Sequence, residues 1–144
     1  MKVGFIGLGI MGSPMAGHLI KAGHDLFLHA GRSIPQNLVD AGGRACASGR
    51  EIAENADVVI IMVPDTPHVE DVLFNPEGVA AGLSAGKIVV DMSSISPVAT
   101  KDFARRINAV GCEYLDAPVS GGEVGAKAAS LTRAGRLLSV AGGG

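Results

Sequence analysis

The chain has 144 residues, 47% of them hydrophobic and 18% charged, a size and composition typical of one globular domain. Its formal net charge is -2 and its basic residues are not clustered, so we expect no nucleic acid partner. No apolar run approaches the roughly 20 residues that cross a bilayer, so we expect no membrane association, and the cysteines and histidines lack metal-ligand spacing, so we expect no metal. The two cysteines are scarce, which fits a reducing compartment, and the first residues enter a strand pattern rather than a signal peptide, so we expect a cytoplasmic protein.

Strand patterns and helix patterns alternate along the chain. An apolar run at 3–6 predicts a strand, the glycines at 7–9 predict a turn, and the spacing of Met11, Met15 and Leu19 predicts a helix over 10–22. Ser48 and Glu51 have the spacing of a capping box at the start of a short helix. The remaining predicted strands are 25–30, 57–63, 87–92 and 113–116, and the remaining predicted helices are 35–41, 50–55, 66–74 and 96–110.

This alternation predicts an α/β fold with a doubly wound parallel sheet of the Rossmann type. Ligands of such sheets bind outside the carboxyl ends of the strands. We therefore expect the functional residues in five loops at one edge of the sheet, which begin near residues 7, 30, 63, 93 and 117.

Gly7, Gly9 and Gly12 form a GxGxxG pattern between a predicted strand and a predicted helix, which is typical of a dinucleotide-binding loop. In such a loop Gly7 would make the tight turn, Gly9 would let the backbone approach a pyrophosphate, and Gly12 would allow close contact between helix and sheet. Amides at the start of the helix would then stabilise the anion. The alternative is that the glycines only make a turn.

The end of the second predicted strand bears on the choice of cofactor. An acidic residue about 20 residues beyond the glycines would bind the 2′-hydroxyl of NAD, and none stands there. Arg32 would instead hold the 2′-phosphate of NADP, because it offers a charge and several donors. We therefore favour NADP, with NAD or mixed use as the alternative, and a solvated surface arginine as the other interpretation of Arg32.

Four segments carry a resemblance to a known family, and they occur in this order: FIGLGIMGSPMA at 5–16, IMVPDTP at 61–67, VVDMSSISP at 89–97 and DAPVSGG at 116–122. Together they resemble the β-hydroxyacid dehydrogenase family over residues 1–132. Within it they are more similar to the tartronate semialdehyde reductases than to the 3-hydroxyisobutyrate dehydrogenases. The resemblance implies hydride transfer between a nicotinamide cofactor and a small semialdehyde or hydroxyacid.

The resemblance also implies a set of cofactor-binding residues. Met62, Val63 and Pro64 would line the adenosine side of the cofactor, and Ser94 would lie near the nicotinamide. The glycine loop would contribute the rest of the set, which is Gly7, Leu8, Gly9, Ile10, Met11 and Gly12. Asp65 follows these strand residues, and we expect it to cap a helix rather than to act as an acid or base.

A second loop would bind the substrate. By the same resemblance Ser120, Gly121 and Gly122 would receive the substrate carboxylate, and consecutive amides of a glycine-rich loop form an anion site. An ordinary loop after a strand is the alternative.

The sequence departs from the family pattern at its proton donor. The family uses a lysine in a GxxxKxxxN helix of a second, helical domain, and neither that motif nor that domain occurs in this sequence. Lys127 is the lysine near the substrate loop and the candidate substitute. We expect an NAD(P)-binding domain over 1–132 and an atypical tail over 133–144, from a frame shift, a truncation or a local insertion. Alone, the chain would bind dinucleotide without turnover and would self-associate through uncovered apolar surface.

Overall fold

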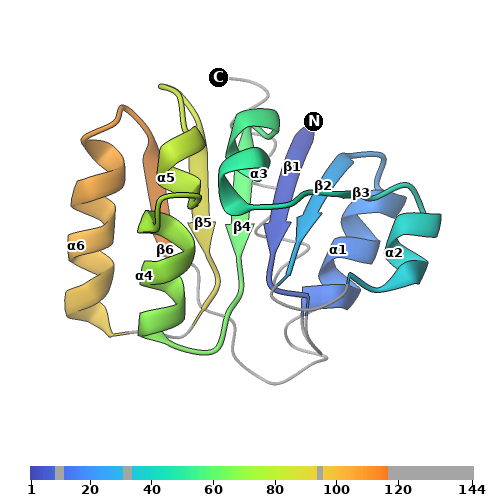
Figure 1. Cartoon of the computed structure of the whole chain (residues 1–144), viewed down its shortest axis with the longest axis horizontal. Helices are drawn as coiled ribbons and strands as arrows, with labels where there is room; N and C mark the ends of the chain where they lie inside the picture. The colour runs from blue at the N-terminus through green and yellow to red at the C-terminus, as the bar shows by residue number, and fades with distance from the viewer. Residues whose placement is uncertain (9–11, 31–33, 94–95, 117–144) are drawn as a thin grey trace.

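The computed structural model describes residues 1–8, 12–30, 34–93 and 96–116. These residues form a six-stranded parallel sheet with the strand order β3-β2-β1-β4-β5-β6 (Figure 1). The strands are β1 (Lys2–Ile6), β2 (Asp25–His29), β3 (Arg44–Ala45), β4 (Val58–Ile61), β5 (Ile88–Asp91) and β6 (Glu113–Asp116). This arrangement confirms the predicted doubly wound α/β fold.

Helices cover both faces of the sheet. Two of them pack on one face, α1 (Gly12–Lys21) and α2 (Gln36–Asp40). Four pack on the other face, α3 (Gly49–Asn55), α4 (Thr66–Phe74), α5 (Val79–Gly82) and α6 (Pro97–Asn108). Parallel strands covered in this way are apolar on both sides, and the four residues of β4 are all buried.

Alternation along the central strands divides the core into two clusters. Val58 and Ile60 of β4 pack on the side of α1, whereas Val59 and Ile61 pack on the side of α3 and α4. Gly4 lets α3 approach β1 closely, because a Cβ at this position would overlap the side chain of Ile52. Because β1 and β4 are the two central strands of the six, their ends lie at the centre of the sheet edge.

The predicted elements are present, and two short ones were not expected. The predicted helix start is confirmed, because Ser48 Oγ accepts a hydrogen bond from the Glu51 amide over 3.1 Å, while the Glu51 carboxylate accepts from the Ala47 amide over 2.9 Å. Strand β3 has two residues and α5 has four, too few for a periodic pattern to show in the sequence. The predicted strand over 57–63 is shorter in the structure, where it covers Val58–Ile61. Within the described ranges, no helix has the length and apolar character needed to span a bilayer.

Candidate functional site

The strand order reverses between β1 and β4, which are parallel neighbours at the centre of the sheet: β2 and β3 lie on one side of β1, and β4, β5 and β6 follow on the other. After β1 the chain enters α1 on one face, and after β4 it enters α4 on the opposite face (Figure 1). Loops that leave two neighbouring strands toward opposite faces open a crevice between them, which is where such sheets bind ligands. The candidate site is therefore formed by the residues that follow these two strands.

The turn after β1 is pressed against the backbone of β4. Gly7 has φ +99°, and a Cβ on it would overlap the carbonyl oxygen of Met62 and lie 2.7 Å from its carbonyl carbon. A Cβ on Gly12 would overlap the carbonyl oxygen of Gly7 and lie 3.2 Å from Cε1 of Phe5. The Gly7 amide donates to the carbonyl oxygen of His29 over 3.2 Å. Both positions therefore require glycine for reasons of space, and Gly7 also for its backbone angle.

Helix α1 begins at this turn and favours an anion at its start. Its first turn carries no acidic side chain, so the positive end of the helix dipole is not neutralised there. Ser13 Oγ donates to the carbonyl oxygen of Leu8 over 2.9 Å, which closes the turn without using a carboxylate. The residues Gly9, Ile10 and Met11, predicted to bind the cofactor, lie outside the described residues. What is described fits a bound diphosphate: a close backbone turn, no acid, and a helix start.

The loop after β4 contains the residues predicted for the adenosine side, Met62, Val63 and Pro64. The Val63 amide donates to Ser93 Oγ over 2.9 Å, which ties this loop to the end of β5. Asp65 caps α4, as expected, because its Oδ1 accepts from the His68 amide over 3.2 Å. These contacts give the loop a defined course along the crevice.

His68 also contacts the capping carboxylate through its ring. Its Nδ1 lies 2.6 Å from Oδ1 of Asp65, and both side chains are exposed. Hydrogen bonds from the ring and the amide of His68 lower the pKa of Asp65. A carboxyl with a lowered pKa stays ionised at neutral pH, which suits a helix cap and not a general acid.

At the end of β2, His29 borders the same edge. Its Nδ1 lies 3.1 Å from the carbonyl oxygen of Cys46, and since a carbonyl oxygen only accepts, Nδ1 carries the proton. No signal in the sequence pointed to this contact, because a lone histidine carries no motif. Arg32, the residue predicted to bind the 2′-phosphate of NADP, lies outside the described residues.

The thiol of Cys46 is unreactive. Burial, with a smaller effect of Glu51, raises the pKa of Cys46 to about 11, so this thiol is not a nucleophile at neutral pH.

A buried polar cluster joins the end of β5 to Tyr114, the second residue of β6, and the sequence analysis missed it. Asp91 is 0% exposed and Ser93 is 3% exposed. Asp91 Oδ1 accepts from the Ser93 amide over 2.9 Å, and Oδ2 accepts from the hydroxyl of Tyr114 over 2.5 Å. Burial raises the pKa of Asp91, and burial together with the hydrogen bond to Asp91 raises that of Tyr114. The signal in the sequence that could have revealed this cluster was a single acidic residue, Asp91, at the end of an apolar strand.

The other predicted residues fall outside the part of the chain that the structure describes. Ser94 lies between the described residues Ser93 and Ser96. The predicted substrate residues Ser120, Gly121 and Gly122 and the candidate donor Lys127 lie beyond residue 116. No group of three or more His, Cys, Asp or Glu residues in the described ranges has a metal-binding arrangement.

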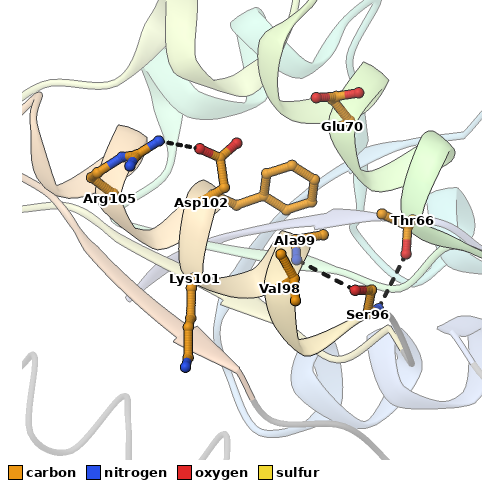
Figure 2. A pocket seen from close by; sticks show the side chains of 9 residues that line it. Thr66, Glu70, Ser96, Val98, Ala99, Lys101, Asp102 and Arg105 are labelled. Atoms are coloured by element: carbon orange, nitrogen blue, oxygen red, sulfur yellow. Dashed lines mark hydrogen bonds and ion pairs between the residues drawn. The ribbon is translucent and has the colours of Figure 1, made fainter.

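A surface groove of about 750 Å³ lies between α4 and α6 (Figure 2). Asp102 on its rim pairs with Arg105 over 2.5 Å, and Thr66 Oγ1 accepts from the Ser96 amide over 3.2 Å. The residues that line it are Thr66, Glu70, Ser96, Val98, Ala99, Lys101, Asp102, Phe103 and Arg105. Since Asp102 and Arg105 already neutralise each other and Val98 is exposed, the groove offers no arrangement for chemistry.

Residues 2–135 match the family described as the NAD binding domain of 6-phosphogluconate dehydrogenase. The chain belongs to this family. It is 51% identical over 132 residues to the 2-hydroxy-3-oxopropionate reductase of Escherichia coli (strain K12), a match that covers 92% of this chain and 45% of the reductase. The chain therefore spans about half the length of the curated relatives it matches.

Two solved structures agree with this assignment. The complex of Psf3 with NADP+ and 2-OPP superposes with a TM-score of 0.81 at 31% identity, over 88% of this chain and 45% of that one. The 3-hydroxyisobutyrate dehydrogenase from Salmonella typhimurium superposes with a TM-score of 0.77 at 35% identity, over 92% of this chain and 50% of that one. The chain is thus a nicotinamide dinucleotide-binding domain of the Rossmann type.

Proposed function

We propose that this chain is the nucleotide-binding part of an NAD(P)-dependent reductase that converts 2-hydroxy-3-oxopropionate, also called tartronate semialdehyde, to glycerate. The observation that carries the proposal is the glycine turn, where Gly7 and Gly12 bring the backbones of β1, α1 and β4 together at the switch point of the sheet. The 51% identity to the Escherichia coli reductase supports this substrate. The 35% identity to a 3-hydroxyisobutyrate dehydrogenase supports that substrate as the second candidate.

The residues of the crevice hold the cofactor in this proposal. Amides of the loop from Gly7 to Gly12 and the start of α1 bind the diphosphate. Met62, Val63 and Pro64 line the adenosine side, and Ser94 lies near the nicotinamide. When bound, the cofactor supplies the hydride.

The substrate is held by the loop that follows β6. Ser120, Gly121 and Gly122 bind its carboxylate through amides and one hydroxyl. Reduction of an aldehyde also needs a proton donor for the oxygen, and these 144 residues hold no GxxxKxxxN motif, with Lys127 as the local substitute. We infer that the domain over 1–132 binds dinucleotide and that this chain by itself does not turn over.

A titration combined with a turnover assay tests the proposal. Purified chain is titrated with NADPH and with NADH, and is then assayed with tartronate semialdehyde and with 3-hydroxyisobutyrate. We expect saturable binding and no turnover. Absence of binding to either nucleotide would refute the cofactor assignment, and robust turnover would refute the argument from the missing lysine motif.

The preference for NADP depends on Arg32 and is tested separately. Charge-assisted hydrogen bonds contribute about 1.5–3 kcal/mol, so Arg32→Ala should weaken NADPH binding by roughly 10- to 100-fold and change NADH binding little. Arg105→Ala is the matched control, because this exposed arginine on α6 pairs only with Asp102 among the described residues. An unchanged ratio of NADPH to NADH affinity would remove Arg32 from the cofactor site.

A further inference from the structure

A line of hydrogen bonds runs from β6, past the end of β5, to the loop after β4, beside the candidate cofactor crevice. It begins at Tyr114 on β6, whose hydroxyl donates to the carboxylate of Asp91 at the end of β5. The other carboxylate oxygen accepts from the Ser93 amide. Ser93 Oγ in turn accepts from the amide of Val63, 30 residues earlier in the chain. The line therefore ends on the backbone of the loop after β4.

A buried polar cluster stabilises this part of the core no better than apolar side chains would. Asp91 is fully buried, and none of the ion pairs formed by the described residues includes it. A buried carboxylate loses its hydration, and apolar residues of similar volume often give equal or better stability. Hydrogen bonds have a direction that apolar contacts lack, so a fully satisfied polar cluster specifies one arrangement of the groups it joins. What this cluster specifies is the position of the Val63 amide.

A second hydrogen bond joins the same two loops further along. The Ser96 amide donates to Thr66 Oγ1 over 3.2 Å, again between residues 30 apart in the chain (Figure 2). We call the pairs Val63–Ser93 and Thr66–Ser96 the loop clasp. The clasp holds the loop after β4 and the loop after β5 side by side at the sheet edge.

The clasped loop also supports the glycine turn. The carbonyl oxygen of Met62 is the atom that a side chain on Gly7 would strike, and Val63 is the next residue. The short segment from Met62 to Val63 is thus held by Ser93 on one side and lies against the Gly7 turn on the other. A shift of Val63 would move the wall of the crevice and the support of the turn together.

We propose that Ser93, Asp91 and Tyr114 are positioning residues for nucleotide binding: they set the Val63 backbone, and through it the crevice between the loops after β1 and β4. The side chains need not contact the nucleotide. This inference rests on the proposed cofactor site. It adds residues that act on that site through the backbone of Val63.

The first experiment compares variants of the 144-residue chain by NADPH titration and by thermal unfolding. Ser93→Ala removes the acceptor of the Val63 amide, and Tyr114→Phe removes one hydroxyl from the cluster. Loss of one such hydrogen bond should weaken NADPH binding by roughly 5- to 20-fold for Ser93→Ala and by roughly 2- to 5-fold for Tyr114→Phe. Lys87→Met is the control, because Lys87 Nζ donates to the carbonyl oxygens of Ala53 and Glu54 at the amino-terminal edge of the sheet. It should lower the melting temperature and leave NADPH affinity within about 2-fold.

A second pair of variants avoids the buried core. Thr66 is only partly buried at the start of α4, so Thr66→Val keeps the shape of the side chain and loses the acceptor, whereas Thr66→Ser keeps the acceptor. We expect weaker NADPH binding for the valine variant and near wild-type binding for the serine variant. Equal binding by the two would overturn the role of the Thr66–Ser96 pair.

Amide hydrogen exchange tests the clasp without nucleotide. Exchange at Val63 should accelerate in Ser93→Ala and Tyr114→Phe but not in Lys87→Met. If wild type binds NADPH and the first two variants bind equally well, or if their Val63 exchange is unchanged, the positioning role is overturned while the proposed function stands. If wild type binds neither NADPH nor NADH, both are overturned.

Discussion

Replacing Gly12 by alanine tests whether the turn between β1 and α1 has room for a side chain. The new Cβ would overlap the carbonyl oxygen of Gly7 and lie 3.1 Å from its carbonyl carbon, and backbone atoms cannot rotate away. Overpacking of this kind costs up to about 3 kcal/mol, and alanine returns about 1 kcal/mol because it favours a helix. We therefore expect Gly12→Ala to lower the free energy of unfolding by about 2 kcal/mol.

Two further glycine variants separate crowding from backbone strain. Gly23 has φ +94°, and apart from its chain neighbours no atom of the described residues lies within 4 Å of the place a Cβ would take. Gly23→Ala therefore measures the backbone cost alone, about 1 kcal/mol. Gly7 combines φ +99° with overlap on Met62, so Gly7→Ala should cost about 4 kcal/mol, the sum of the two effects.

Urea unfolding followed by circular dichroism measures all three variants on one scale. The expected order of destabilisation is Gly7→Ala, then Gly12→Ala, then Gly23→Ala. If Gly12→Ala is as stable as the wild type or more so, the helix preference of alanine has outweighed the overlap. The close approach at the glycine turn would then be refuted as the reason for glycine at this position.

Three other predictions concern single side chains. Ser48→Ala removes the acceptor of the Glu51 amide at the start of α3, and urea unfolding should show a loss of about 1 kcal/mol; no loss would exclude the cap as a source of stability. Burial raises the pKa of Asp91, so the stability it contributes is full below its unfolded pKa and is lost as pH rises through the folded value. Asp91→Asn should therefore gain stability relative to wild type as pH rises above the unfolded pKa, about 3.9, and a difference that stays constant as pH rises would contradict the shift. Hydrogen bonds from His68 lower the pKa of Asp65, so its contribution is present above the unfolded pKa, near about 3.9, and is lost as pH falls through the folded value. Asp65→Asn should flatten the acid limb of the stability curve, and an acid limb parallel to that of wild type would argue against the cap.

Much of the fold follows from short windows of the chain. The apolar run within 57–63 predicts a strand covered on both faces, and the structure buries all four residues of the shorter strand that forms, Val58–Ile61. Ser48 and Glu51 predict a helix start from their spacing alone, and the predicted bond forms. Such signals are local because period, capping and turn chemistry involve residues within about four positions of one another.

Local signals were insufficient for the buried cluster and for the shortest elements. Strand β3 exists only because Arg44 and Ala45 pair with Phe27 and Leu28 of β2. His29 gains a defined ring position only from the carbonyl of Cys46, 17 residues away. Neither contact leaves a pattern in its own stretch of sequence.

By itself, the sequence determined the alternation of strands and helices, the glycine turn after β1 and the edge of the sheet where a ligand would lie. The tertiary structure decided which groups became neighbours: β1 beside β4, the Tyr114 hydroxyl against the buried Asp91, and Ser93 against the Val63 amide. The physical reason is the distance along the chain over which each effect acts. Propensity and periodicity act along a few consecutive residues, whereas burial and hydrogen bonding join residues 30 positions apart only after the sheet has assembled.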